Sequence, residues 1–132
     1  MAWELINHTG DIGVVARAPT LEGLLAECAR AMFEVLAEPG TPSPAGTEAF
    51  PVAGADPAEE LRDFLSELLY RFSADRKMYV AFTPGKGSVL AAWEPYDGAR
   101  HPLRTELKAV TYHQLEAVPE GPGWRGRVIF DV

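Results

Sequence analysis

Two stretches of the sequence carry apolar residues at the spacing of an α-helix, and they constrain the fold more than any other feature. The first follows Thr20, a suitable N-cap residue, with Glu22 in the first turn, where an anion suits the helix dipole. The pattern predicts a helix that ends near Glu38, before the Pro39-Gly40 pair. Its apolar positions recur every three or four residues: Leu21, Leu24, Leu25, Cys28, Met32, Val35 and Leu36.

The second helical stretch has the stronger start signal. Asp56 can cap the helix, Pro57 suits its first position, and Glu59 would complete a capping box. We expect this helix to end around residues 73–75. Its apolar stripe consists of Leu61, Phe64, Leu65, Leu68, Leu69 and Phe72.

Runs of strand-forming residues surround the two helices. Strands are expected at residues 3–6 and 12–18, on either side of a turn that contains His8 and Asp11, and at residues 48–52 between the helices. After the second helix the pattern predicts strands at residues 78–82, 88–93, 106–112, 114–118 and 124–130. Two helices packed on a largely antiparallel sheet make an α+β fold. No internal repeat or linker interrupts residues 1–132, so we expect a single domain.

The charge and the single cysteine exclude several classes of protein. The formal net charge is -7, with no run of basic residues. This argues against tight, direct binding to a nucleic-acid backbone and favours a basic protein partner, a cation or plain solubility. Cys28 is the one cysteine, so no internal disulfide can form, and its apolar helical position predicts a buried packing role. The first residues include no basic segment and no long apolar run, so we expect a cytoplasmic protein without a membrane span.

The segment Pro84-Gly85-Lys86-Gly87-Ser88 resembles a phosphate-binding loop only superficially. The full Gly-x-x-x-x-Gly-Lys-Ser/Thr spacing is absent, and no helical pattern follows it. Its turn-forming residues predict a connection between two strands.

Two aspartates lie at the ends of strand-like runs near the two termini. Asp11 follows the first turn, and Asp131 precedes Val132, whose main-chain carboxylate ends the sequence. Small domains often bring their termini together, and three carboxylates in one place repel one another unless a cation lies between them. Oxygen ligands suit calcium or magnesium. Taken singly, Asp11 is an ordinary turn residue and Asp131 an ordinary residue at a strand edge.

Histidines and one lysine provide further candidates. Lys108 and His113 belong to a polar cluster that interrupts a late strand, and His8 lies in the turn before Asp11. A single histidine is more often a hydrogen-bonded structural residue than a functional one. We therefore regard His8, Lys108 and His113 as supporting or partner-facing candidates. The sequence has neither a Cys/His cluster for zinc nor a nucleophile elbow, and a cysteine within a helix, as expected for Cys28, makes a poor catalytic pair with histidine.

Four motifs, in the same order and over essentially the whole chain, resemble those of the archease family. They are His8-Thr9-Gly10-Asp11-Ile12-Gly13, Glu67-Leu68-Leu69-Tyr70-Arg71-Phe72, the segment from Arg100-His101 through Thr105 to His113, and the terminal run Val128-Ile129-Phe130-Asp131-Val132. Two positions depart from the family pattern. Gly10 replaces an alanine, and Asn7 stands where the family commonly has an acidic residue, so a charge role at position 7 does not carry over.

The resemblance implies a helper protein of tRNA splicing and RNA repair. Archeases activate the RNA ligase that joins 2′,3′-cyclic phosphate or 3′-phosphate ends to 5′-hydroxyl ends, promoting guanylylation of the ligase and its multiple turnover. The resemblance also implies a strand–helix–strand–strand module with an α/β insertion. Family members bind calcium through residues that correspond by motif to Asp11, Asp131 and Val132.

Three functions therefore compete. The first is a metal-binding, non-enzymatic activator of an RNA ligase. The second is a metal-dependent phosphoester hydrolase with His8 or His113 as acid or base. The third is a general chaperone or adaptor for enzymes that modify nucleic acids. Turnover by the purified protein alone separates the first two, and the number of client proteins separates the first from the third.

Overall fold

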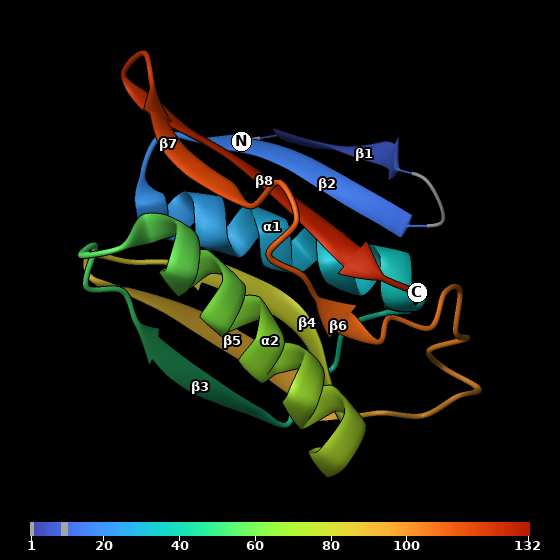
Figure 1. Cartoon of the computed structure of the whole chain (residues 1–132). Coiled ribbons are helices and arrows are strands. Elements are labelled where there is room, and N and C mark those ends of the chain that lie inside the picture. The colour runs from blue at the N-terminus through green and yellow to red at the C-terminus, as the bar shows by residue number, and fades with distance from the viewer. Residues whose placement is uncertain (1, 9–10) are drawn as a thin grey trace.

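The computed structural model describes residues 2–8 and 11–132, without the side chains of Asn7 and His8. Over these residues the chain forms two antiparallel sheets with a helix between them (Figure 1). Helix α1 (Leu21–Leu36) contacts both sheets, and α2 (Pro57–Asp75) packs beside it. The larger sheet contains β1 (Ala2–His8), β2 (Asp11–Ala18), β6 (Ala109–Val110), β7 (Glu116–Glu120) and β8 (Gly123–Asp131). The smaller sheet contains β3 (Gly46–Pro51), β4 (Lys77–Pro84) and β5 (Ser88–Pro95).

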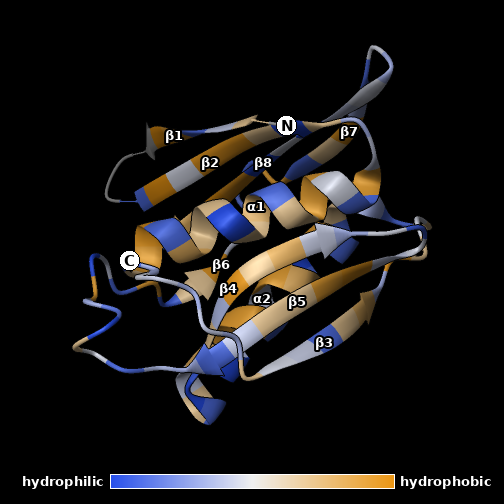
Figure 2. Cartoon of the chain, turned by 180° about the vertical axis from the view of Figure 1, so that it is seen from behind, coloured by the Kyte–Doolittle hydropathy of each residue, from blue (hydrophilic) through white to orange (hydrophobic). Residues whose placement is uncertain are grey.

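The strand order confirms the α+β class and divides the strands between two sheets. The larger sheet has the order β1-β2-β8-β6, with β7 also paired to β8, and the smaller has the order β3-β5-β4. The segment from β3 through α2 to β5 lies between α1 and β6 in the chain, so it is the α/β insertion that the resemblance implies. Apolar residues dominate β4 and β5 (Figure 2).

Helix α1 is buried on almost every side, because the larger sheet packs against one side of it and the smaller sheet against the other. Only Glu22, Arg30 and Glu34 along its length are not fully buried. The Thr20 hydroxyl accepts a hydrogen bond from the Gly23 N–H at 3.0 Å, which confirms the predicted cap. The helix ends at Leu36, two residues before the predicted end, because the next residue adopts an extended conformation and bridges to residue 103.

The start of α2 follows the prediction in part. The Asp56 carboxylate accepts a hydrogen bond from the Glu59 N–H at 3.3 Å, and Pro57 occupies the first helical turn. In the predicted capping box, the carboxylate that accepts from the Asp56 N–H was expected to be that of Glu59. In the structure it is that of Glu60. The Glu60 carboxylate accepts from the backbone of the incoming residues 53, 54 and 56, whereas Glu59 accepts from the hydroxyl of Tyr112. Glu60 therefore fastens the loop that enters α2.

The strand predicted at residues 106–112 is wrong in its length. Only Ala109 and Val110 form strand β6, because β6 and β7 share one edge of β8 and a turn must separate them. In that turn the Leu115 N–H donates to the Tyr112 carbonyl, and Gln114 has a left-handed backbone with φ of 52°. As a result, β7 begins two residues later than predicted, at Glu116. The other predicted strands agree with the structure to within a few residues.

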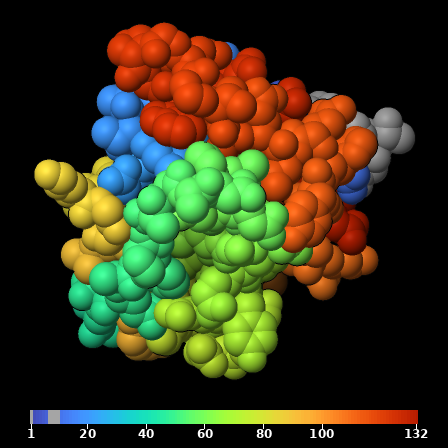
Figure 3. Space-filling model, turned by 60° about the vertical axis from the view of Figure 1, so that its left-hand side comes forward, coloured from blue at the N-terminus to red at the C-terminus, as the bar shows by residue number. Residues whose placement is uncertain are grey.

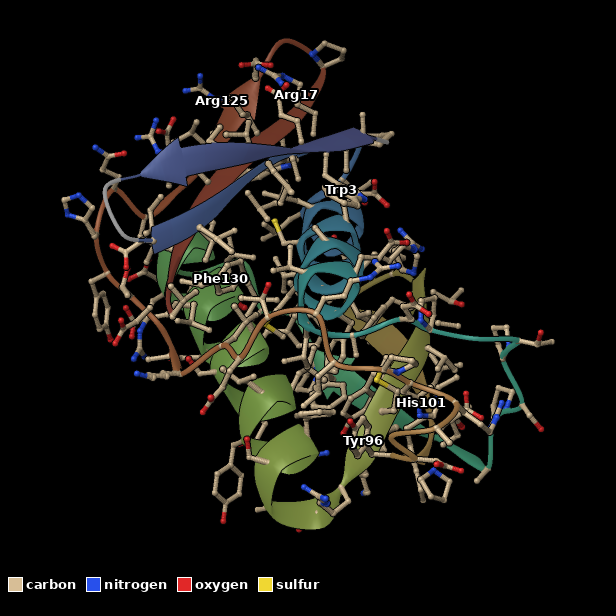
Figure 4. The ribbon with its side chains drawn as sticks, turned by 90° about the vertical axis from the view of Figure 1, so that its right-hand side faces the viewer. Trp3, Arg17, Tyr96, His101, Arg125 and Phe130 are labelled. Atoms are coloured by element: carbon tan, nitrogen blue, oxygen red, sulfur yellow. The ribbon has the colours of Figure 1, made fainter. Side chains whose placement is uncertain are left out.

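A buried polar cluster anchors the segment that leads from β5 to β6. His101 and Glu94 are 0% and 1% exposed, and the His101 ring stacks on Tyr96 with 5.8 Å between centroids (Figure 4). The Nδ1 atom of His101 accepts a hydrogen bond from the Asp97 N–H at 3.0 Å. Its Nε2 atom therefore carries the proton that faces Glu94, at 3.3 Å. Arg100 donates to the other Glu94 oxygen at 2.8 Å.

This cluster determines the ionisation of Glu94. Burial acts to raise the pKa of Glu94, but the hydrogen bonds from Arg100 and His101 outweigh it and hold that pKa below its ordinary value. The segment is also fastened to the end of α1, since the Arg104 N–H donates to the Leu36 carbonyl at 2.9 Å. These contacts fix the path by which the chain reaches β6.

Two further sequence predictions are confirmed. Residues 85–87 form the turn between β4 and β5, in which Gly87 has a φ of 78° that favours glycine. Cys28 is fully buried in α1, and this burial raises its pKa to about 12, so the thiol packs as an apolar group. Neither helix in the described part of the chain has the length and apolar character that a membrane crossing requires.

The Glu94 cluster predicts a specific dependence of stability on pH. Because the pKa of Glu94 is lower in the folded state, its ionisation stabilises the fold above the unfolded pKa of about 4.3. That contribution is lost as the pH falls through the folded pKa. We expect Glu94→Gln to reduce the free energy of unfolding at pH 7 by about 1–3 kcal/mol. The same change should make the loss on acidification smaller.

Urea unfolding at pH 7 and at successively lower pH values measures both effects. Glu106→Gln, on the exposed part of the same segment, is the matched control and should behave like the parent protein. An equally steep acid loss in Glu94→Gln and in the parent would contradict the assignment.

Candidate metal centre

The pairing of β2 with β8 sets the relative positions of the two candidate aspartates. The two strands pair antiparallel, from Ala18 opposite Trp124 to Ile12 opposite Phe130. Continuing this pairing by one residue places Asp11 directly across from Asp131. Residues directly opposite in an antiparallel pair project to the same face, with Cβ atoms about 4.5–5.5 Å apart. The strand register therefore brings together two carboxylates that are 120 positions apart in the sequence.

Asp131 lies on the face of the larger sheet that is turned away from α1. Phe130 is fully buried in the core (Figure 4). The next residue along the strand therefore points to the opposite face, where Asp131 is exposed. One row further in, Gly13 lies between Ile6 and Ile129. A Cβ atom on Gly13 would lie 2.5 Å from Ile6 Cγ1 and 2.7 Å from Ile129 Cδ1. Only glycine leaves room for these two isoleucine side chains, which form an apolar patch next to Asp11 and Asp131.

Strand β6 holds Asp131 from the other side. Ala109 pairs with Asp131, and the Lys108 N–H donates to the Asp131 carbonyl at 2.8 Å. Thr111 donates its N–H and its hydroxyl to the Ile129 carbonyl, at 3.0 and 2.9 Å. Asp131 thus lies in a paired strand almost to the end of the chain. Val132 follows it, half-buried against the core, so the carboxylate expected there would lie one residue from the Asp131 side chain.

The three supporting candidates, His8, Lys108 and His113, belong to segments next to the two aspartates. The backbone of His8 pairs with Asp11, but its side chain, like residues 9 and 10, lies outside the described residues. Lys108 is exposed beside Asp131. His113 is exposed in the turn after β6, where its N–H donates to the Thr111 hydroxyl at 3.2 Å.

The donor set fits a hard cation that keeps part of its water shell. Among the described residues, no three side chains of His, Cys, Asp or Glu gather closely enough to hold a metal. The aspartate pair would therefore need the carboxylate of Val132, backbone oxygens and water to complete a shell. Calcium accepts such mixed oxygen ligands and takes six to eight of them. An exposed position at a sheet end leaves space for that water.

Sequence reasoning missed a contact beside this site. The Arg62 guanidinium lies over the Tyr112 ring, 4.1 Å from its centroid, and the Tyr112 hydroxyl donates to Glu59 at 2.8 Å. That hydrogen bond is the main reason the pKa of Tyr112 is raised. Glu59 and Arg62 share one face of α2 through their three-residue spacing, which was the available signal. Nothing in the sequence pattern connected them to a tyrosine 50 residues away.

Comparison with known proteins identifies the family of this chain. Residues 3–132 match the Archease protein family. Protein archease from Methanopyrus kandleri is 33% identical over 140 residues, covering all of both chains. Protein archease from Methanosarcina acetivorans is 34% identical and covers 98% of this chain and 95% of the relative.

Solved structures give the same result. The solution structure of protein 1598 from Methanobacterium thermoautotrophicum has a TM-score of 0.74 at 27% identity and covers 98% of each chain. The crystal structure of an archease from Thermotoga maritima, described as a possible chaperone, has a TM-score of 0.70 at 20% identity. It covers 96% of this chain and 94% of that one, and at this identity it shows the fold alone. Because the family match and the relatives above 30% identity extend over nearly the whole sequence, this chain belongs to the archease family.

Proposed function

We propose that this protein is a metal-binding, non-enzymatic activator of an RNA ligase. The ligase is the one that joins 2′,3′-cyclic phosphate or 3′-phosphate ends to 5′-hydroxyl ends in tRNA splicing or RNA repair. The activator promotes guanylylation of that ligase and its multiple turnover in the cytoplasm. Membership of the archease family supports this function. The observation that carries it is the β2–β8 register, which pairs Ile12 with Phe130 and, continued by one residue, would set Asp11 opposite Asp131.

The carboxylates supply the reason for a metal. Asp11, Asp131 and the carboxylate of Val132 repel one another when no cation is bound. A divalent ion held there would neutralise this charge and supply the Lewis acid that nucleotidyl transfer requires. Asp11 pairs with His8 of β1, and Asp131 pairs with Ala109 of β6, so strand pairing would hold such an ion in a defined position. We propose calcium as the ion, because every expected donor is an oxygen.

The placement of the usual catalytic groups supports a helper role. The loop at 84–88 is a strand-to-strand turn. Cys28 is buried with a raised pKa, and His101 is enclosed with Glu94. Cys28, His101 and Glu94 stabilise the fold and do not face solvent. The hydrolase alternative therefore depends on His8 or His113, and the adaptor alternative on a broader set of partners.

The charge balance suits the proposed partner. A net charge of -7 favours docking on a basic surface, and a ligase that handles RNA needs such a surface. Complementary charge mainly increases the association rate and weakens with salt. The proposed complex should therefore form more slowly as the salt concentration rises.

The first prediction concerns the effect of metal on stability. Calcium at a hundredfold excess over its dissociation constant should add roughly 2.7 kcal/mol to the free energy of unfolding, because it binds only the folded state. Thermal melts with calcium and with a chelator measure this difference. Asp11→Asn and Asp131→Asn should abolish it, whereas Asp75→Asn, at the exposed end of α2, should retain it. Identical melts, with no metal found by elemental analysis, would defeat the metal proposal.

The second prediction concerns activity. The protein alone should neither join RNA ends nor consume GTP, because the groups named above are confined to the core or to a turn. Added to its cognate ligase, it should raise the guanylylated fraction of that ligase, and Asp131→Ala should lose this effect. A reconstituted guanylylation assay measures both results. GTP hydrolysis or end joining by the rigorously purified protein would favour an enzyme instead.

A third prediction tests the end of the chain. Appending a residue after Val132 moves the terminal negative charge about 3.8 Å along the chain and leaves a weaker amide oxygen. A short C-terminal tail should therefore weaken metal binding and ligase activation while the protein stays folded. The same tail before Met1 is the control and should be tolerated better, because residues 2–8 of β1 separate it from Asp11. A C-terminally extended protein with full metal binding would exclude the carboxylate of Val132 as a ligand.

A further inference from the structure

A groove of about 290 Å³ lies between helix α2 and the segment around β6 (Figure 3). In this view the green atoms of α2 border the orange atoms of the chain that follows residue 105. The polar residues that line the groove are Arg62, Ser66, Tyr70, Ser73 and Lys108. The first four form one stripe along α2, at helical spacing, beside the stripe that packs into the core.

The charge of this groove is opposite to that of the protein as a whole. Among the residues that the structure describes, two cations and three hydroxyl groups line it and no carboxylate does, although the chain has a net charge of -7. Asp63 lies 3.6 Å from Arg62, but its side chain is 63% exposed, and such a surface ion pair is weak. The groove therefore presents positive charge and hydrogen-bond donors to solvent.

Arg62 is held in place but lacks one partner. Its guanidinium carbon lies over the Tyr112 ring, 4.1 Å from the centroid, and the Tyr112 hydroxyl donates to Glu59. Among the described residues, Arg62 Nε is the buried side-chain nitrogen without a hydrogen-bond acceptor. Buried donors almost always have an acceptor, because an unmade hydrogen bond is costly. The buried Nε cannot itself reach an external acceptor, but the Arg62 side chain is 26% exposed, so the outer nitrogens of this stacked guanidinium are the donors that it offers to the groove.

We propose that this groove binds a phosphoryl group. Arginine offers a planar set of donors that matches phosphate oxygens, and lysine adds a second point of positive charge. The hydroxyls of Ser66 and Ser73 supply further donors. The ring of Tyr70 is 63% exposed and borders the groove, which provides a flat surface for the base of a phosphate ester such as a mononucleotide.

The phosphoryl site is distinct from the proposed metal centre and does not depend on it. Its side chains come from α2 and from Lys108, whereas the aspartates lie on β2 and β8. The two sites are connected through Lys108, whose backbone N–H donates to the Asp131 carbonyl. A single phosphoryl group also agrees with the acidic net charge, which argues against tight binding of a long phosphate backbone.

Titration of metal-free protein with inorganic phosphate at constant ionic strength tests the proposal. We expect saturable shifts of the backbone amides of Ser66 and Ala109 in nuclear magnetic resonance spectra. Arg62→Gln and Lys108→Gln should each weaken binding by roughly tenfold or more. Lys86→Gln, in the exposed β4–β5 turn, is the matched control and should bind phosphate like the parent.

A second titration with adenosine monophosphate identifies the source of the phosphoryl group. Tighter binding than phosphate, with shifts of the Tyr70 ring signals, supports a phosphate ester, and equal binding supports free phosphate. Tyr70→Ala should remove only the advantage of the nucleotide. Shifts that do not saturate, or that persist unchanged in Arg62→Gln and Lys108→Gln, would overturn the proposal. Thermal melts of each variant establish that it is folded.

Discussion

Strand β8 pairs with β2 along one edge and with both β7 and β6 along the other. Its register decides which side chains enter the core and which reach the outer face. Val128 and Phe130 are fully buried in the core, and a slip of one residue would bring either Arg127 or Asp131 to the core face in their place, beside Ile129. The packing of two apolar residues therefore fixes the position of Asp131. The candidate metal centre is a consequence of core packing in this account.

Helix α1 transmits the same constraint to the rest of the molecule. It lies between the two sheets, so its residues must be apolar on both sides and its neighbours must approach closely. Gly126 of β8 shows this, because a Cβ atom there would lie 3.1 Å from Leu24 of α1. The end of α1 also receives the segment that carries Arg104 and Lys108 toward β6. The fold thus places β6 between two neighbours. Asp131 pairs with it along one edge, and α2 packs against it from another side.

The sequence predicted the features that depend on local pattern. Helix starts at Thr20 and Asp56 follow from side chains that accept backbone hydrogen bonds within three residues. The periodicity of the apolar residues was sufficient to predict both helices and most strands. It could not divide the strands between two sheets, because each strand shows only that it has a buried face. It also overextended β6, whose length depends on competition with β7 for the edge of β8.

The candidate site was predictable to a different extent. The motifs identified Asp11 and Asp131 as candidates, and the observed register pairs their neighbours Ile12 and Phe130. Gly13 was part of a motif, but its reason, the close packing of Ile6 and Ile129, needs the three-dimensional structure. The stacking of Tyr112 on Arg62 was invisible because it joins surface residues 50 positions apart. Long-range contacts between polar side chains leave no periodic signal.

Calcium titration of the isolated protein, followed by backbone amide signals, tests the central claim most directly. The account predicts saturable shifts centred on Ile12, Ala109 and Val132, and their loss in Asp131→Asn. The acidic start of α2, around Glu59 and Glu60, is the competing place for a cation on this surface. Shifts centred there, or no saturable shift at all, would contradict the account.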